Sequence, residues 1–153
     1  MEMDYELLNR QLSSLAEEEA WYVPLFSNAA ALLFEALPGI NWAGFYLVRG
    51  EGLVLGPFQG KTACIHIARD KGVCGAALRE GRTMRVPNVH AFPGHIACDS
   101  ASNSEIVIPL WRRGQVAAVL DIDSPLLNRF SPADQAGLEE FARILEKNVQ
   151  IDL

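Results

Sequence analysis

The sequence predicts an α+β fold, in which a central, mainly antiparallel sheet is flanked by helices from the N- and C-terminal parts of the chain. Apolar residues recur at helical spacing near both termini, and between them apolar runs of strand length are separated by short turns. The 153 residues fit the usual size of one domain and contain no linker-like stretch. We therefore expect a single domain over residues 1–153.

The first 37 residues are expected to form two helices. An apolar stripe at spacings of three and four marks the first helix, and it consists of Tyr5, Leu8, Leu12 and Leu15. A second stripe follows Pro24, extends over residues 25–36 and stops at Pro38-Gly39.

Strand-like segments follow. The apolar and aromatic residues 41–48, a turn at residues 50–52 and the apolar residues 53–58 predict a hairpin. A short strand around residues 65–67, with Cys64 placed on it, and a short helix over residues 73–80 are expected next.

The second half of the chain begins with a loop. Residues 87–104 are rich in Pro, Gly, Asn, Asp and Ser and show no periodicity, a combination usually found in functional or disordered connections. Strands at 105–111 and 115–123 should pair through a tight turn at Arg113-Gly114. Ser131 is a candidate N-cap, with Pro132 at the first position of the last helix. The apolar stripe of that helix is Leu138, Phe141, Ala142, Leu145 and Val149.

Composition narrows the class of protein. With 13 Lys and Arg against 19 Asp and Glu, a formal charge of −6 and no basic block, we expect binding neither to nucleic acid nor to an anionic membrane. No apolar run approaches the roughly 20 residues that cross a bilayer. The start Met1-Glu2-Met3-Asp4 does not look like a signal peptide. Three cysteines do not suit the paired disulfides of secreted domains, so we expect a cytoplasmic protein with mostly reduced thiols.

Three carboxylates form the first candidate site. Strand alternation places Asp121 and Asp123 on one face and Ile122 on the other, and antiparallel pairing should bring Glu105 close to both. Like charges in a partly dry site raise at least one pKa, which leaves an acid able to donate a proton near neutral pH. Such a cluster could also bind an ammonium group. The alternative is solvated polarity at the ends of two strands.

An aromatic pair forms the second candidate. Trp42 and Tyr46 are four residues apart on one strand, so both rings point the same way. Ordinary core packing explains most such pairs. An aromatic wall beside carboxylates would also suit a small cationic or sulfur-bearing ligand.

The cysteines are the third candidate. Cys98 lies in the long loop with His90 and His95, where an accessible cysteine near positive partners can ionise to a thiolate. Cys64 and Cys74 could instead be small buried hydrophobes. A zinc site from the thiols and the three histidines lacks the close cysteine pair of structural sites, because nine residues separate Cys64 from Cys74. We expect neither a metal nor a cofactor, since residues 72–75 also fit no phosphate-binding loop.

Five segments carry a resemblance to a known family. They are Gly56-Pro57-Phe58-Gln59-Gly60, Lys71-Gly72-Val73-Cys74-Gly75, the run 90–99 with Pro93-Gly94-His95-Ile96-Ala97-Cys98-Asp99, Ser104-Glu105-Ile106-Val107 and Val119-Leu120-Asp121-Ile122-Asp123-Ser124. Together they resemble the free methionine-(R)-sulfoxide reductases, which are small stand-alone GAF-domain enzymes. Ordinary GAF domains lack the three cysteines at these spacings.

The resemblance implies a GAF-like fold and a role for each matching residue. Cys98 matches the catalytic cysteine, Cys64 a resolving cysteine that forms a disulfide with it, and Cys74 a third cysteine whose role varies among members. The substrate pocket is matched by Trp42, Tyr46, Glu105, Asp121 and Asp123.

The resemblance also implies substrate and partners. The family reduces the R epimer of free methionine sulfoxide, recycles through thioredoxin, and commonly forms homodimers. The alternative function is that of a GAF-type module which binds or senses a small ligand without catalysis, because a fold does not by itself imply catalysis.

Overall fold

The computed structural model describes residues 2–95 and 101–151. Its centre is a six-stranded sheet in the order β3-β2-β1-β6-β5-β4, with antiparallel pairing between all neighbours. The strands are β1 (Trp42–Arg49), β2 (Gly52–Gly60), β3 (His66–Ile67), β4 (Met84–Val86), β5 (Ser104–Arg112) and β6 (Gln115–Ser124). The helices are α1 (Tyr5–Glu18), α2 (Tyr22–Ala36), α3 (Gly72–Glu80) and α4 (Pro132–Asn148), with a short 3-10 turn η1 (Val89–Ala91).

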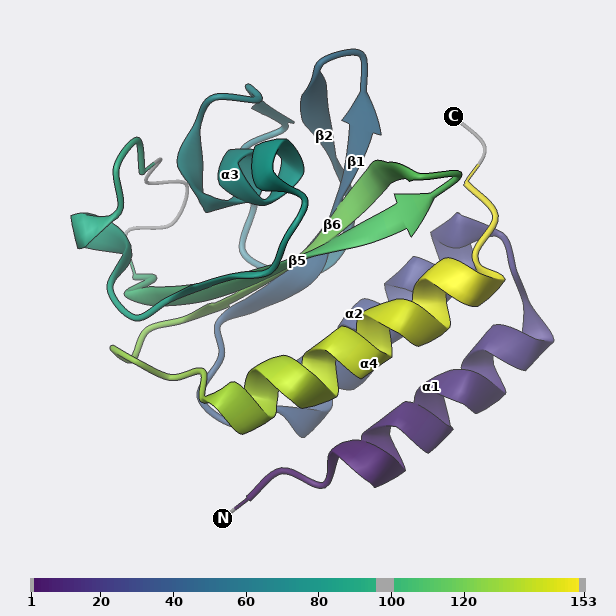
Figure 1. Ribbon diagram of the computed structural model, residues 1–153. Coiled ribbons are helices and arrows are strands. Elements are labelled where there is room, and N and C mark those ends of the chain that lie inside the picture. The colour runs from purple at the N-terminus through teal and green to yellow at the C-terminus, as the bar shows by residue number, and fades with distance from the viewer. Residues whose placement is uncertain (1, 96–100, 152–153) are drawn as a thin grey trace.

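The sheet separates two layers of helices. Helices α1, α2 and α4 cover one face, and α3 covers the other (Figure 1). The α+β class, the antiparallel sheet and the flanking terminal helices are therefore confirmed. None of the helices in the described part of the chain is long and apolar enough to span a membrane.

Local sequence explains the ends of several elements. Asp4 caps α1, because its side chain accepts a hydrogen bond from Leu7 N at 3.0 Å. Ser131 caps α4 as expected and forms a reciprocal capping box with Asp134, while Pro132 occupies the first turn.

The structure differs from the predicted elements in three details. The sequence pattern did not predict the short strand β4, in which Arg85 lies between two apolar residues. The turn η1 lies inside the segment that was expected to be a plain loop. Cys64 does not lie on a strand but directly precedes β3, which contains only residues 66–67. The carbonyl of Cys64 accepts a hydrogen bond from the Tyr46 hydroxyl, a side-chain contact that no sequence periodicity reports.

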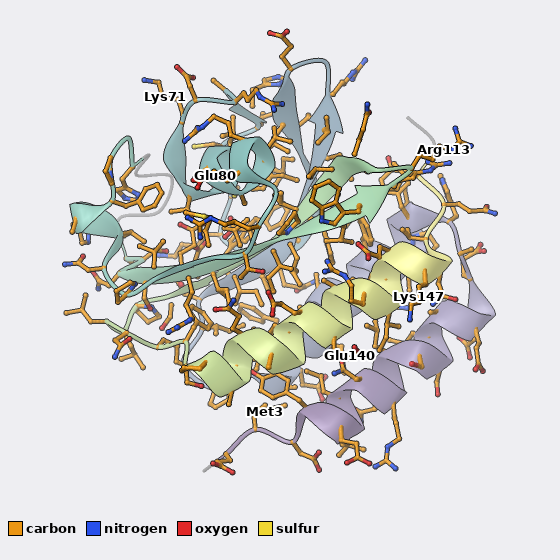
Figure 2. All side chains as sticks on the ribbon, viewed as in Figure 1. Met3, Lys71, Glu80, Arg113, Glu140 and Lys147 are labelled. Carbon is orange, nitrogen blue, oxygen red and sulfur yellow. The ribbon has the colours of Figure 1, made fainter. Side chains whose placement is uncertain are left out.

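Two apolar cores lie on the two faces of the sheet. Strand alternation in β6 sends Leu120 and Ile122 into the larger core under α1, α2 and α4, and Val119 into the smaller core under α3. Charged side chains such as Glu140 and Lys147 lie on the outer side of α4, away from both cores (Figure 2). Asp121 and Asp123 share the α3 face with Val119, which places carboxylates beside a core.

Candidate active site

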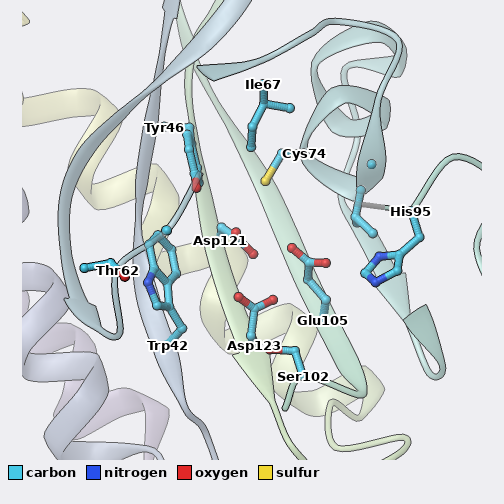
Figure 3. A pocket seen from close by; sticks show the side chains of 13 residues that line it. Trp42, Tyr46, Thr62, Ile67, Cys74, His95, Ser102, Glu105, Asp121 and Asp123 are labelled. Carbon is cyan, nitrogen blue, oxygen red and sulfur yellow. The ribbon is translucent and has the colours of Figure 1, made fainter. Parts of the chain in front are cut away.

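A pocket opens on the α3 face of the sheet. Three carboxylates point into it, with Trp42 and Tyr46 on one side and His95 on the other (Figure 3). The lining residues are Trp42, Tyr46, Thr62, Ala63, Ile67, Gly72, Val73, Cys74, His95, Ser102, Glu105, Asp121 and Asp123. Every predicted pocket residue is therefore present in one cavity.

The register of two strand pairs assembles the carboxylates. Glu105 in β5 lies opposite Asp123 in β6, and the next residue on the same face of β6 is Asp121. On the other side of β6, Trp42 in β1 also lies opposite Asp123. The proximity predicted from the β5–β6 hairpin is confirmed, and solvated strand-end polarity is excluded for Glu105 and Asp121, which are only 9% and 5% exposed.

Burial controls the protonation of this cluster. Burial raises the pKa of Glu105 well above its usual range, and the negative charge of Asp121 raises it further. Burial, followed by the charge of Asp123, likewise raises the pKa of Asp121. The Oδ1 atom of Asp121 has no hydrogen-bond partner among the described residues. Because carboxylates crowded in a dry site cannot all ionise, the pocket retains at least one proton at neutral pH.

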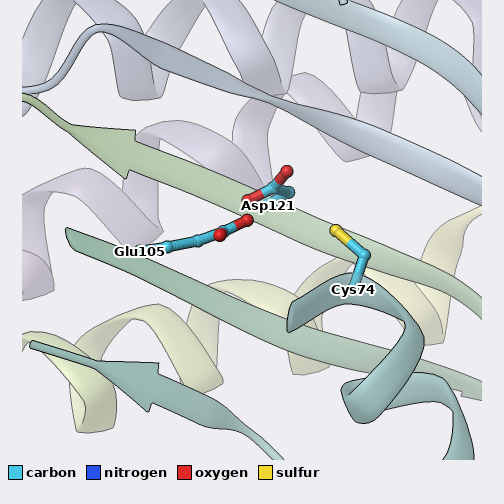
Figure 4. A group of neighbouring side chains, drawn as sticks. All are labelled: Cys74, Glu105 and Asp121. Atoms are coloured by element: carbon cyan, nitrogen blue, oxygen red, sulfur yellow. The ribbon is translucent and has the colours of Figure 1, made fainter. Parts of the chain in front are cut away.

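Cys74 projects from the first turn of α3 toward the acids. Its sulfur and one carboxylate oxygen each from Glu105 and Asp121 all lie within 4.8 Å of one another (Figure 4). Cys74 is a free, buried cysteine, and burial followed by the charges of Asp121 and Glu105 raises its thiol pKa well above the usual range. The side chain therefore stays a thiol and is a weak nucleophile.

The Cys74 sulfur and the two carboxylate oxygens could together bind a metal ion. Among the described residues, this trio, rather than the histidines of the zinc alternative, has potential ligand atoms close enough together. It offers three ligand atoms, whereas a structural zinc site uses four. His90 and His95 instead contact each other, with ring centroids 5.7 Å apart.

An aromatic stack forms the wall opposite α3. The rings of Trp42 and Tyr46 are stacked with centroids 5.9 Å apart, and Phe58 in β2 stacks on Trp42 at 5.2 Å. Phe58 lies opposite Gly44 in the β1–β2 pair. A Cβ atom on Gly44 would lie 2.8 Å from both the Phe58 Cα and the Trp42 ring, so glycine at this position makes the stack possible.

The polar atoms of the wall are directed toward the backbone. The indole nitrogen of Trp42 donates to the Lys61 carbonyl at 3.1 Å, and the Tyr46 hydroxyl donates to the Cys64 carbonyl at 2.9 Å. Burial, followed by the negative charge of the neighbouring carboxylates, Asp121 first, raises the Tyr46 pKa far above its usual value, so the hydroxyl keeps its proton. The wall thus offers ring faces to a ligand, and the carboxyl groups offer the polar contacts.

Sequence reasoning missed four contributors to the site. Thr62 and Ser102 line the pocket, Phe58 extends the aromatic stack, and His95, expected only as a neighbour of Cys98 or as a ligand in the zinc alternative, also lines the pocket. Burial, followed by the charge of His90, lowers the pKa of His95, which therefore favours its neutral form. Gly44 lies between Trp42 and Tyr46 on the same face of β1. A residue without a side chain at that position was the sequence signal that could have indicated the close approach of Phe58.

The remaining predicted residues are two cysteines. Cys64 is half-buried and disulfide-bonded, so it is not the free buried thiol of the simplest interpretation. Cys98 lies outside the described residues, and its catalytic role stays a prediction.

Comparison with known proteins places this architecture in a family. The GAF domain family matches residues 23–149. The chain is 50% identical over 143 residues to the free methionine-R-sulfoxide reductase of Escherichia coli K12, and the match covers 94% of this chain and 87% of that protein.

Two solved structures agree with the sequence comparison. The reduced form of fRMsr from Staphylococcus aureus superposes with a TM-score of 0.94 at 48% identity and 97% coverage of both chains. The free methionine-R-sulfoxide reductase of Neisseria meningitidis, in complex with its substrate, superposes with a TM-score of 0.91 at 46% identity, covering 94% of this chain and 87% of that one. The chain therefore has the GAF fold and belongs to the family of free methionine-R-sulfoxide reductases.

Proposed function

We propose that this protein reduces free L-methionine-(R)-sulfoxide to L-methionine, with Cys98 as the nucleophile. The observation that carries the proposal is the juxtaposition of buried, proton-retaining carboxyl groups with a stacked aromatic wall in one pocket. A sulfoxide needs both features, because its methyl and sulfur groups pack on rings and its oxygen leaves only after protonation. The relatives carrying this activity in their names support the assignment.

The net result of the chemical step is the transfer of one oxygen atom from sulfur to sulfur. The Cys98 thiolate attacks the sulfoxide sulfur and forms an S–S bond, while a carboxylic acid of the cluster protonates the sulfoxide oxygen, which leaves as water when the S–O bond breaks. A water molecule then adds to the Cys98 sulfur and loses a proton, and the S–S bond breaks. Methionine leaves with that electron pair and Cys98 becomes a sulfenic acid, so the cysteine is oxidised by the two electrons that reduce the sulfoxide. Trp42 would seat the substrate methyl group, and an ionised carboxylate would bind its ammonium.

Recycling requires a second thiol. The Cys98 sulfenic acid condenses with the Cys64 thiol and releases water, which leaves a disulfide that a dithiol such as thioredoxin opens by exchange. Support for Cys64 as the resolving residue comes from its disulfide-bonded state and from the contrast with Cys74, which is a free thiol of raised pKa. We assign Cys74 to the catalytic site as a neighbour of the acids, not as the first resolving thiol.

Glu105→Gln should slow the chemical step. General acids contribute about 10²–10⁴-fold to proton-transfer rates, and two further acids remain in the pocket, so we expect a loss of about tenfold or more in single-turnover reduction. Because burial raises the pKa of Glu105, its acid form persists to neutral pH and is lost as pH rises through that raised value. The wild-type rate should therefore fall as pH rises, and Glu105→Gln should remove that part of the pH dependence. Rapid-quench measurement of methionine formation over a series of pH values from acidic to alkaline tests this, with the exposed Glu51→Gln as matched control. An unchanged rate and profile would remove Glu105 from the chemistry.

Acetylation of the substrate nitrogen should weaken binding. An ammonium group paired with a buried carboxylate contributes about 1.5–3 kcal/mol as a charged hydrogen bond, which the neutral amide cannot replace. We therefore expect the Kd for N-acetyl-methionine-(R)-sulfoxide to rise by at least about tenfold relative to the free amino acid. Single-turnover rates measured against substrate concentration give the Kd of each substrate. Equal Kd values would show that the carboxylates do not bind the ammonium group.

The competing function is a sensor or binding module without catalysis. Consumption of NADPH in the presence of thioredoxin, thioredoxin reductase and methionine-(R)-sulfoxide distinguishes the two, because a binding module consumes none. The same assay tests thioredoxin as the reductant, since omission of thioredoxin should stop the consumption of NADPH, while methionine should still form when dithiothreitol supplies the electrons directly. We further propose a single domain over residues 1–153, a cytoplasmic location and a homodimer, and light scattering of the purified protein tests the last of these.

A further inference from the structure

The two aromatic residues of the pocket hold the segment that carries the resolving cysteine. The indole N–H of Trp42 donates to the carbonyl of Lys61 at 3.1 Å, and the Tyr46 hydroxyl donates to the carbonyl of Cys64 at 2.9 Å. Both donors come from β1, whereas both acceptors lie in the segment between β2 and β3. The pocket wall and residues 61–64 are therefore joined at both ends of that segment.

The backbone beyond Cys64 is fixed by the sheet. Leu55 N in β2 donates to the Ile65 carbonyl at 2.8 Å, next to the register pairs of β2 with the edge strand β3. Cys64 itself lies outside the ladder, and the Tyr46 hydroxyl contacts its carbonyl at the point where strand pairing has stopped. The Tyr46 hydroxyl thus supplies the hydrogen bond that a neighbouring strand would otherwise give to the Cys64 carbonyl.

The Tyr46 hydroxyl is well suited to this contact. Tyr46 is only 2% exposed and its ring lies in the stack with Trp42, so the hydroxyl has a defined position. Burial and the nearby acids raise its pKa, which keeps the hydroxyl protonated and a donor at neutral pH. Since its one proton is directed to the Cys64 carbonyl, it is not the group that protonates the sulfoxide oxygen.

We propose that Tyr46 is a positioning residue for disulfide formation, in addition to lining the pocket: its hydroxyl fixes the backbone of Cys64, the residue assigned to resolve an oxidised Cys98. The inference rests on the proposed function, in which Cys64 resolves the Cys98 sulfenic acid. Disulfides tolerate only a narrow range of backbone separation and orientation. A displacement of about 1 Å at a reacting group can slow a reaction on the order of 100-fold, so release of one backbone anchor should be visible in this step.

Tyr46→Phe isolates the hydroxyl, because the ring and its stacking are kept. In a single turnover without reductant, methionine release is followed by rapid quench, and disulfide closure is followed by alkylation of the remaining thiols and mass spectrometry. We expect disulfide closure to slow about tenfold or more beyond any change in methionine release. We also expect a larger yield of Cys98 sulfenic acid trapped by a cyclic 1,3-dione. Tyr5→Phe is the matched control, since it removes a hydroxyl that donates to Asp134 at 2.5 Å, outside the pocket.

A second route to the sulfenic acid keeps the inference independent of the substrate. Hydrogen peroxide oxidises a cysteine thiolate to sulfenic acid directly, with release of water or hydroxide. Slow closure in Tyr46→Phe after both oxidants supports the inference. Closure at the wild-type rate, or an equal slowing of methionine release and closure, overturns it. Absence of methionine from the wild type would refute the proposed function, while the peroxide experiment would still decide the role of Tyr46.

Discussion

Cys98→Ser is expected to abolish reduction of free methionine-(R)-sulfoxide while the protein stays folded. A serine hydroxyl at neutral pH does not replace a thiolate as a nucleophile toward sulfur, and the remaining cysteines are poor substitutes. Burial raises the pKa of the Cys74 thiol, and Cys64 lies in the connection between β2 and β3 rather than in the family motif at residues 90–99. Single-turnover methionine yield is the measurement, and the expected value is below about a tenth of wild type, consistent with loss of the nucleophile.

The fold of this variant must be verified separately. Matching circular dichroism and thermal unfolding of Cys98→Ser and wild type would exclude a general loss of structure. Cys64→Ser is the appropriate matched variant, because it makes the same chemical change at the other cysteine of the proposed relay. A Cys98→Ser protein that still yields methionine at a substantial fraction of wild type would remove Cys98 from the nucleophilic role.

Cys64→Ser is expected to separate chemistry from recycling. One equivalent of methionine should still form per site, because Cys98 alone can reach the sulfenic acid. Steady-state turnover with thioredoxin should fall on the order of 100-fold, since an external thiol lacks the high effective concentration of an intramolecular one. The coupled NADPH assay and the methionine burst, measured on the same preparation, give the two numbers.

The third cysteine decides how complete this loss is. Cys74 is buried, free and held beside Asp121 and Glu105, and its raised pKa leaves little thiolate for exchange. We therefore expect little rescue by Cys74 in the Cys64→Ser protein. Cys64→Ser, Cys74→Ser tests this directly: full steady-state activity in that double variant would refute an intramolecular relay altogether.

Much of the site was predictable because its residues lie on regular strands. The alternation of Asp121, Ile122 and Asp123 assigned the faces of β6, and the short β5–β6 turn set the register that brings Glu105 opposite Asp123. The same rule placed Trp42 and Tyr46 on one face of β1. For these residues, the two-residue period of side chains along a strand and the antiparallel pairing of β5 with β6 were sufficient to predict their positions.

The rest of the site depends on tertiary contacts between irregular segments. Thr62 and Ser102 reach the pocket from connections without periodicity, and Phe58 reaches it only because Gly44 leaves room across the β1–β2 pair. Cys64 was misplaced onto a strand because its position is fixed by the Tyr46 side chain rather than by ladder pairing. Side-chain anchors of this kind leave no periodic signature in the sequence.

The most direct test of the proposed Cys98–Cys64 relay combines one protein preparation with one equivalent of substrate and no reductant. The reduced protein is mixed with free methionine-(R)-sulfoxide, methionine is quantified, and the oxidised protein is mapped by mass spectrometry after proteolysis. We expect one methionine per chain and a Cys64–Cys98 disulfide, with a free Cys74, and no reaction when the S epimer is used instead. An absence of methionine together with three unchanged thiols would contradict it.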